Sequence, residues 1–108
     1  MRFVQPPQIE PATLSEKLSA DPRPLVLDVR QPQEVQADGR VADSLLIPMN
    51  ELPARIGELP RDREIVAICK RGQRSWNVAQ WLRQQGYDAS SLSGGLDAWT
   101  ARGLPVAR

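Results

Sequence analysis

The sequence predicts an α/β domain with a mostly parallel sheet of about four to five strands, flanked by helices on both faces in three layers. Short apolar runs rich in Val, Ile and Leu alternate along the chain with longer amphipathic segments. This alternation is typical of a parallel sheet covered by helices. The length of 108 residues is that of one typical domain. We therefore expect a single domain over residues 1–108, with its core from about residue 9 to residue 106.

Four short segments are predicted to form the main strands of this sheet. They are residues 25–28, 44–47, 65–68 and 89–92. A fifth, short strand is expected at Gln8 and Ile9. The reason is that Pro11 suits the first turn of a helix, which then runs through Leu14 and Leu18.

A helix is expected between the second and third main strands. Asn50 is predicted to be its N-cap, and Pro60 ends it. Pro53 is compatible with this helix because it falls in the first turn. The apolar face of the helix is formed by Leu52, Ile56 and Leu59.

Two further helices are expected after the third and fourth main strands. The first runs from about residue 75 to residue 85 and turns Val78, Ala79 and Leu82 toward the core. Gly86 follows it, where a left-handed C-terminal cap is usual. Gly94 and Gly95 then turn the chain into a last short helix that carries Leu96 and Trp99 and is closed by Gly103 and Pro105.

Composition and charge exclude several classes of protein. Hydrophobic residues make up 41% of the chain and charged residues 25%, which is typical of a soluble globular domain. A net charge of +1 with mixed signs provides no field to attract nucleic acid or a membrane, so neither is expected as a partner. The N-terminus lacks an apolar run of signal-peptide length, and no later run approaches a membrane span. We expect a cytoplasmic protein.

One cysteine and no histidine narrow the chemistry further. The single cysteine excludes an intramolecular disulfide, and the usual ligands of a zinc or iron site are missing. No metal and no cofactor are therefore expected. The absence of histidine also excludes mechanisms that need a Cys-His or Ser-His pair.

The segment of residues 65–75 is the strongest candidate for a functional site. Cys69 ends a buried strand, at the edge of a parallel sheet where ligands bind, and a helix N-terminus follows it. Three cations and a glycine lie between them: Lys70, Arg71, Arg74 and Gly72. Positive charge and free helix N–H groups favour a thiolate, so we predict a lowered pKa for Cys69. The alternative, a buried cysteine beside a solvated basic surface, is less favoured because so many features coincide.

Several motifs resemble the rhodanese family, in the family's order, over nearly the whole chain. They are Leu27-Asp28-Val29-Arg30 with Pro32 and Glu34, Ile47-Pro48, the loop from Cys69 to Arg74, and Gly94-Gly95-Leu96 with Trp99. The resemblance implies a rhodanese-like fold. It also implies a sulfurtransferase that moves sulfur from thiosulfate or a persulfide donor to cyanide or a thiol acceptor, including an acceptor protein. Cys69 would carry the sulfur as a persulfide.

The spacing from Cys69 to Arg74 is Cys-x4-Arg, the loop length of the family's sulfurtransferases. Related phosphatases and arsenate reductases have one more residue, which widens the loop for a tetrahedral oxyanion. The resemblance thus makes the loop a binding site for the donor anion, formed by Lys70, Arg71, Gly72, Gln73, Arg74 and Ser75. Arg74 has an alternative role, in which it braces the loop.

Two positions depart from the family pattern. Gly39-Arg40-Val41 stands where the family has Gly-His-Ile, and Asp43 replaces a following glycine. Arg40 either reaches an acidic residue of the early motif or is solvated, and solvation is the commoner outcome for an exposed charge.

Three more residues are candidates for support of the pocket. Asp28 and Arg30 either shape the pocket from a neighbouring strand or form a structural pair, and the two readings weigh equally. Trp76 either packs against its surroundings or lines the pocket entrance. Trp99 is expected in the core.

Other functions stay open at this level. A rhodanese-type module can bind a partner or sense sulfide without catalysis, since a fold does not determine a function. A phosphatase or arsenate reductase is disfavoured by the short loop. Sulfur relay to a dedicated acceptor protein would use the same persulfide. The natural donor, the acceptor and the pathway do not follow from the sequence, and a monomer or weak homodimer is expected.

Overall fold

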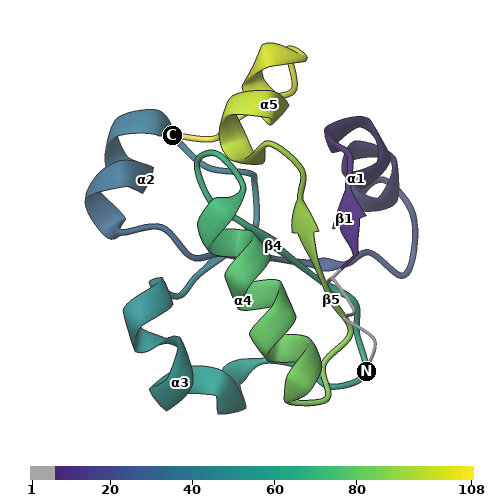
Figure 1. Cartoon of the computed structure of the whole chain (residues 1–108). Coiled ribbons are helices and arrows are strands. Elements are labelled where there is room, and N and C mark those ends of the chain that lie inside the picture. The colour runs from purple at the N-terminus through teal and green to yellow at the C-terminus, as the bar shows by residue number, and fades with distance from the viewer. Residues whose placement is uncertain (1–6) are drawn as a thin grey trace.

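A parallel sheet of five strands forms the centre of the computed structural model, which describes residues 7–108 (Figure 1). The order of the strands across the sheet is β1-β5-β4-β2-β3. In chain order they are β1 (Gln8–Ile9), β2 (Leu25–Asp28), β3 (Leu45–Leu46), β4 (Ile65–Ile68) and β5 (Ala89–Leu92). The sheet confirms the predicted α/β class and all five predicted strands, although β3 is shorter than the predicted segment of residues 44–47.

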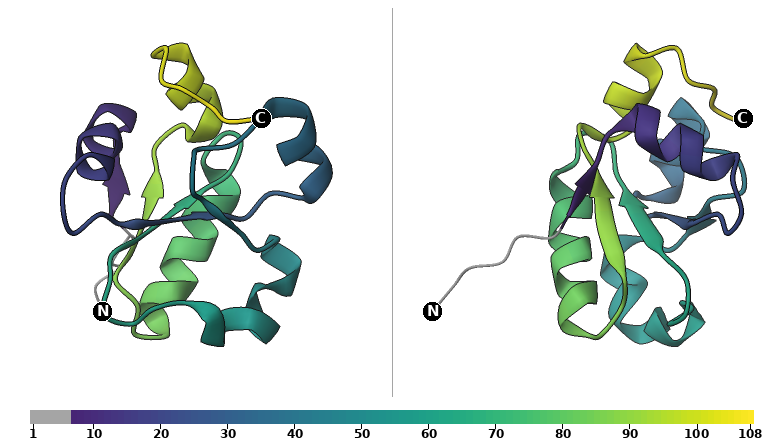
Figure 2. Two further views of the ribbon diagram at one scale, coloured as in Figure 1. Left: turned by 180° about the vertical axis from the view of Figure 1, so that it is seen from behind. Right: turned by 90° about the vertical axis from the view of Figure 1, so that its right-hand side faces the viewer.

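Helices cover both faces of the sheet. They are α1 (Pro11–Leu18), α2 (Pro32–Asp38), α3 (Leu52–Arg55), α4 (Gln73–Gln84) and α5 (Gly95–Ala101). The edge-on view shows α4 on one side of the sheet and α1 on the other (Figure 2). The three predicted layers are therefore present.

The alternation of side chains along the central strands divides the core into two halves. Leu27 of β2 and Ala67 of β4 pack with residues of α3 and α4, whereas Val26 and Val66 pack with residues of α1 and α5. β2 and β4 run in parallel and pair over their full lengths. Because both faces are covered, every residue of β4 is buried, which explains its continuous apolar sequence.

The helix expected after Asn50 is broken into short pieces. Asn50 lies inside a 3₁₀ turn, Met49–Glu51, rather than at the N-cap of α3, so the predicted cap is wrong. Its side-chain oxygen instead accepts a hydrogen bond from Gln31 Nε2 at 3.0 Å. Pro53 does lie in the first turn of α3, and a second 3₁₀ turn, Ile56–Glu58, ends the segment before Pro60.

The helix that follows β4 begins two residues earlier than predicted. α4 starts at Gln73, because Gly72 takes the N-cap position with φ +101°, in the left-handed region where glycine is favoured. Gly86, at φ +92°, has the left-handed conformation expected after this helix. Trp99 is buried, as predicted.

The helix α2 has no counterpart in the prediction. It buries none of its seven residues, so it leaves no apolar periodicity in the sequence. Its N-terminus is held instead by a capping box, in which Gln31 N–H donates to Glu34 Oε2 at 2.9 Å.

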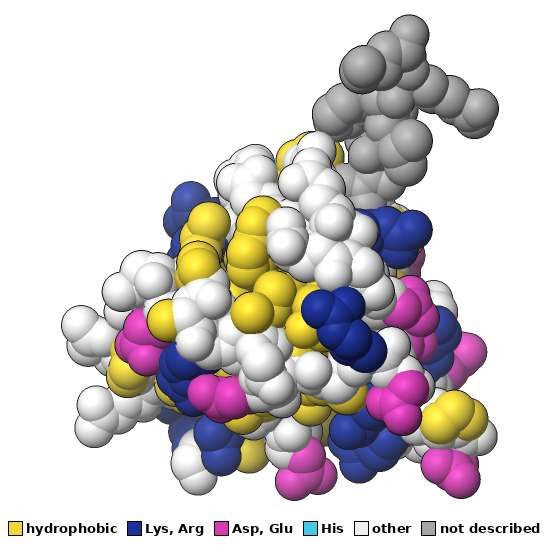
Figure 3. Space-filling view, turned by 90° about the horizontal axis from the view of Figure 1, so that it is seen from below, with side chains coloured by type: hydrophobic (Ala, Val, Ile, Leu, Met, Phe, Trp, Pro, Cys, Tyr) yellow, Lys and Arg dark blue, Asp and Glu magenta, His cyan; other side chains and the backbone are white. Residues whose placement is uncertain are grey.

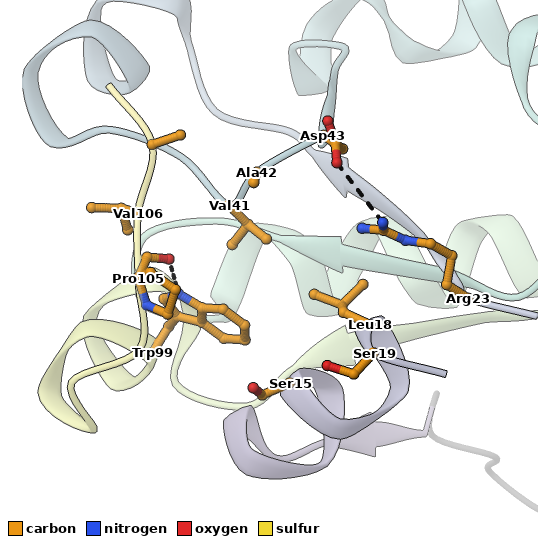
Figure 4. Close-up of a pocket in the computed structure, with 11 residues that line it drawn as sticks. Ser15, Leu18, Ser19, Arg23, Val41, Ala42, Asp43, Trp99, Pro105 and Val106 are labelled. Atoms are coloured by element: carbon orange, nitrogen blue, oxygen red, sulfur yellow. Dashed lines mark hydrogen bonds and ion pairs between the residues drawn. The ribbon is translucent and has the colours of Figure 1, made fainter. Parts of the chain in front are cut away.

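The turn before β3 accommodates the substitution of Asp43 for glycine. Asp43 adopts φ +63°, the left-handed conformation that aspartate tolerates better than most residues. Its carboxylate lies 3.8 Å from Arg23 Nη1 (Figure 4). The two residues border a hollow of about 410 Å³ between α1 and the C-terminal segment, and no residue of the Cys69 loop lines it.

Charged side chains of both signs are interspersed on the end of the molecule shown in Figure 3. No helix among residues 7–108 has the length and apolar character needed to cross a membrane. The expectation that the chain carries no leader concerns an N-terminal segment that lies partly outside the described residues.

Candidate active site

Cys69 lies at the carboxyl end of β4, in the middle of the sheet, and is 1% exposed. The loop from Cys69 to Ser75 curls around its sulfur. Gly72 N–H donates a hydrogen bond to Cys69 Sγ at 3.1 Å, and Ser75 N–H donates another at 3.4 Å. Ser75 Oγ also lies 3.4 Å from the sulfur. The sulfur is thus held by polar hydrogens of the loop and of the first turn of α4.

The N-terminus of α5 holds the other side of this loop. Leu96 N–H donates to the carbonyl of Cys69 at 2.8 Å, and Asp97 N–H donates to the carbonyl of Lys70 at 2.9 Å. A side chain at Gly95 would place its Cβ 2.5 Å from the Lys70 carbonyl oxygen. The Gly94-Gly95 turn therefore allows α5 to approach the loop closely. The two carbonyls point toward the N–H groups of α5.

Ser91 supports Ser75 from the neighbouring strand. The hydroxyl oxygens of Ser75 and Ser91 lie 2.8 Å apart, and both residues are buried. Ser91 belongs to β5 and was not predicted as a site residue. Its only signal in the sequence is a polar residue inside a strand that should be buried, which the pattern alone does not connect to Cys69.

The pKa of Cys69 is lower than that of an ordinary thiol, as the sequence predicts. Burial raises the pKa of Cys69, but hydrogen bonds from the Ser75 hydroxyl and from the N–H groups of Ser75, Gly72 and Arg71 outweigh it. In the thiolate state the Ser75 hydroxyl donates to the sulfur. The cause is therefore chiefly these N–H and O–H donors rather than the cationic side chains.

Replacing Ser75 by alanine should raise the pKa of Cys69, because the thiolate loses its hydroxyl donor while burial stays the same. The pH at which alkylation by iodoacetamide reaches half its maximal rate should move upward. Ser90→Ala is the matched control, since Ser90 Oγ is buried and finds no hydrogen-bond partner among residues 7–108. Equal pH profiles for Ser75→Ala and the wild type would contradict this role for the hydroxyl.

Arg74 braces the loop through Glu34. Its Nη1 and Nη2 atoms each lie 2.8 Å from one oxygen of the Glu34 carboxylate, which makes a two-bonded pair between α4 and α2. These bonds lower the pKa of Glu34 to about 2. The geometry supports the bracing alternative for Arg74. Glu34, which the sequence placed only within a family motif, is therefore a structural partner of the loop.

The Glu34–Arg74 pair should make stability fall in acid. The pKa of Glu34 is lowered from 4.5 to about 2 by folding, so its contribution is present above about pH 4.5 and is lost as pH falls toward 2. The free energy of unfolding, measured with urea from about pH 6 down to about pH 2, should fall less in Glu34→Gln than in the wild type. Equal losses would mean that this pair does not contribute.

The other two loop cations also face carboxylates. Lys70 Nζ lies 3.3 Å from Asp97 Oδ1 and 3.6 Å from Asp38 Oδ2. Arg71 Nε lies 3.8 Å from Asp97 Oδ2, and its side chain is 81% exposed. The sequence did not indicate these acidic partners, because they belong to α2 and α5.

Asp28 and Arg30 form a wholly buried ion pair. Arg30 Nη2 lies 2.7 Å from Asp28 Oδ2 and donates a second hydrogen bond to the Gly39 carbonyl at 2.8 Å. These contacts tie the end of β2 to the end of α2, which is the structural reading of the pair. Arg40 is exposed and its side chain makes no ion pair within residues 7–108; only its backbone pairs, with Ala107.

A hollow of about 570 Å³ opens beside the loop. Trp76 and Gln73 of α4 line it, so Trp76 lies beside the loop, and its role at a pocket entrance stays a prediction. Gln8 lines it as well, because β1 pairs with β5 and so lies close to the loop. Gly72 lines this hollow and also donates its N–H to Cys69 Sγ, so the hollow lies next to the buried sulfur.

The site is built from hydrogen-bond donors and paired charges. Among residues 7–108, no group of three or more Cys, Asp or Glu side chains is arranged to hold a metal ion. A buried cysteine with a lowered pKa, next to an open hollow, is suited to nucleophilic attack on a small electrophilic atom.

Comparisons with known proteins show the family of the chain. The family model described as "Rhodanese-like domain" matches residues 10–102. A protein of Allochromatium vinosum named "Sulfurtransferase" is 39% identical over 100 residues, which cover 92% of each chain. A mitochondrial thiosulfate sulfurtransferase of Saccharomyces cerevisiae is 28% identical, over 73% of this chain and 62% of its own.

A solved structure shows the same architecture. The crystal structure of a rhodanese-related protein from Thermoplasma volcanium superposes with a TM-score of 0.87 and 36% sequence identity. The match covers 94% of this chain and 97% of that one. From the fold, the Cys69 loop and these relatives together, we conclude that the chain belongs to the rhodanese-like domain family.

Proposed function

We propose that this protein is a sulfurtransferase in which Cys69 carries a sulfane sulfur as a persulfide. The donor is thiosulfate or a persulfide, and the acceptor is cyanide or a thiol, including the thiol of an acceptor protein. One observation carries the proposal: the N–H groups of Gly72 and Ser75 donate to Cys69 Sγ, and the Ser75 hydroxyl lies within hydrogen-bond distance of it. The relatives named as sulfurtransferases support it.

In the first step the Cys69 thiolate attacks the outer sulfur of the donor. With thiosulfate, a bond forms between Sγ and the outer sulfur, the bond to the central sulfur breaks, and sulfite leaves with its electron pair. With a hydropersulfide, the displaced thiolate takes the donor's proton and leaves as a thiol. In either case the product is a Cys69 persulfide anion, which the donors of the loop stabilise.

In the second step the acceptor attacks the outer sulfur of the Cys69 persulfide. A cyanide acceptor leaves as thiocyanate. A thiol acceptor leaves as a hydropersulfide, which keeps the proton of the thiol. The bond that breaks returns its electron pair to Sγ, which restores the thiolate. Because the enzyme alternates between two covalent states, ping-pong kinetics are expected.

The same geometry weakens the alternatives. A non-catalytic binding module has no need of a cysteine whose pKa is lowered by a set of aligned donors. A phosphatase is disfavoured by the Cys-x4-Arg spacing from Cys69 to Arg74, which is one residue shorter than the loop of the related phosphatases. Neither alternative is favoured by a feature of the site as described for residues 7–108.

Intact mass spectrometry tests the proposal directly. Incubation with thiosulfate, or with a hydropersulfide, should add the mass of one sulfur atom, and cyanide should then remove it. Hydrolysis of an aryl phosphate, measured in parallel, should be absent. Failure of both donors to add sulfur would overturn the proposed function.

A further inference from the structure

The three cations of the Cys69 loop are all opposed by carboxylates. Arg74 is bonded to Glu34, Lys70 lies between Asp38 and Asp97, and Arg71 faces Asp97. The three positive side chains are thus matched by three negative ones. The buried pair of Asp28 and Arg30 beneath them is also balanced. The charged side chains around the loop therefore sum to no net positive charge, and the backbone N–H groups of Gly72 and Ser75 are left to attract an anion.

Asp97 is the central acidic residue of this arrangement. It is the only one of the three carboxylates whose own backbone N–H is bonded to the loop, since it donates to the Lys70 carbonyl at 2.9 Å. This bond holds its carboxylate beside the loop, 3.3 Å from Lys70 Nζ and 3.8 Å from Arg71 Nε. Arg71, which lines the hollow, is the cation that an incoming donor would meet first.

The charge of the donor determines how much this balance matters. Thiosulfate brings two negative charges toward a thiolate, and that repulsion must be offset by nearby positive charge. The hydropersulfide of an uncharged thiol is neutral when protonated and carries one negative charge when ionised. Because Coulomb energy scales with the product of the charges, a balanced site penalises the dianion more.

We infer that Asp97, assisted by Asp38, is a specificity-determining residue that makes Cys69 favour organic hydropersulfides over dianionic donors such as thiosulfate. This inference rests on the proposed persulfide chemistry at Cys69. It concerns the relative rates of the two donor classes, so slow turnover of thiosulfate is compatible with it. The carboxylates act by neutralising Lys70 and Arg71, not by contact with the reacting sulfur.

The test compares two donors on charge-neutralised variants. The rate constant for formation of the Cys69 persulfide is measured by intact mass with thiosulfate and with the hydropersulfide of 2-mercaptoethanol. Asp97→Asn should raise the thiosulfate rate constant about threefold to tenfold at low ionic strength, and added salt should reduce this gain. The hydropersulfide rate constant should change much less. Asp38→Asn should act in the same direction but more weakly, because Asp38 faces Lys70 alone.

Asp62→Asn is the matched control. It removes the same charge at an exposed residue that precedes β4, whereas Cys69 follows β4, so the two residues lie at opposite ends of this strand. This variant should leave the ratio of the two rate constants unchanged. Urea unfolding of each variant checks that the fold is retained. If Asp97→Asn is unstable, the ratio of rate constants in Asp38→Asn tests the inference independently.

The outcomes separate the inference from the proposed function. If the wild type gains no sulfur from either donor, the proposed function itself fails. If the persulfide forms but neither Asp97→Asn nor Asp38→Asn changes the ratio of rate constants, the inference is wrong. An equal change in Asp62→Asn would also overturn it, because the effect would then come from total charge rather than from the loop.

Discussion

Cys69→Ser is expected to lose sulfur transfer almost completely, by on the order of a thousandfold or more. A serine hydroxyl in the same ring of donors is not ionised near neutral pH and cannot form the persulfide. The variant should gain no sulfur from thiosulfate or from a hydropersulfide in the intact-mass experiment. Its steady-state production of thiocyanate from cyanide should fall to the level of the reaction without enzyme.

A second form of the protein serves as a chemical control. Cys69 is the single cysteine of the chain, so iodoacetamide blocks the same atom in the wild type without any substitution. The blocked protein should be as inactive as Cys69→Ser, while circular dichroism and urea unfolding report an intact fold. Sulfur transfer that survives both treatments would show that Cys69 is not the carrier.

Arg30→Met should reduce stability more than any surface substitution, by about 3–5 kcal/mol. Arg30 and Asp28 are both fully buried, and the substitution leaves the Asp28 carboxylate without its charged partner and with only the backbone N–H of residue 30. The Gly39 carbonyl loses a hydrogen bond at the same time. The free energy of unfolding, measured with urea at neutral pH, gives the size of the loss.

Two further variants locate the cause of that loss. Arg40→Met removes an exposed arginine and should change the free energy of unfolding by no more than about 0.5 kcal/mol. Combining Arg30→Met with Asp28→Asn removes the stranded charge and should recover part of the stability. A loss in Arg30→Met no larger than in Arg40→Met would contradict the structural role of the buried pair.

Much of the fold could be predicted because its strands are local features of the sequence. Ile65–Ile68 is apolar throughout since β4 is covered on both faces, and that pattern needs no knowledge of distant residues. The helix α2 could not be predicted in the same way, because it buries none of its residues. Residue type alone predicts an N-cap at Asn50, whereas the chain there forms a 3₁₀ turn and the side chain accepts a hydrogen bond from Gln31.

The candidate site also contains features that local sequence predicts and features that depend on distant residues. The sequence alone was enough to predict Cys69 as the nucleophile and to place the loop and the helix that follows it, because residues 69–75 are consecutive and their arrangement depends on short spacing. The role of Cys69 as nucleophile stays a prediction. Only the tertiary structure decided the partners that tune them. Glu34 and Asp97 lie far from the loop in the chain, as does Ser91, and parallel strand pairing brings all three to one edge of the sheet. Charge balance depends on distances in space, which residue order does not contain.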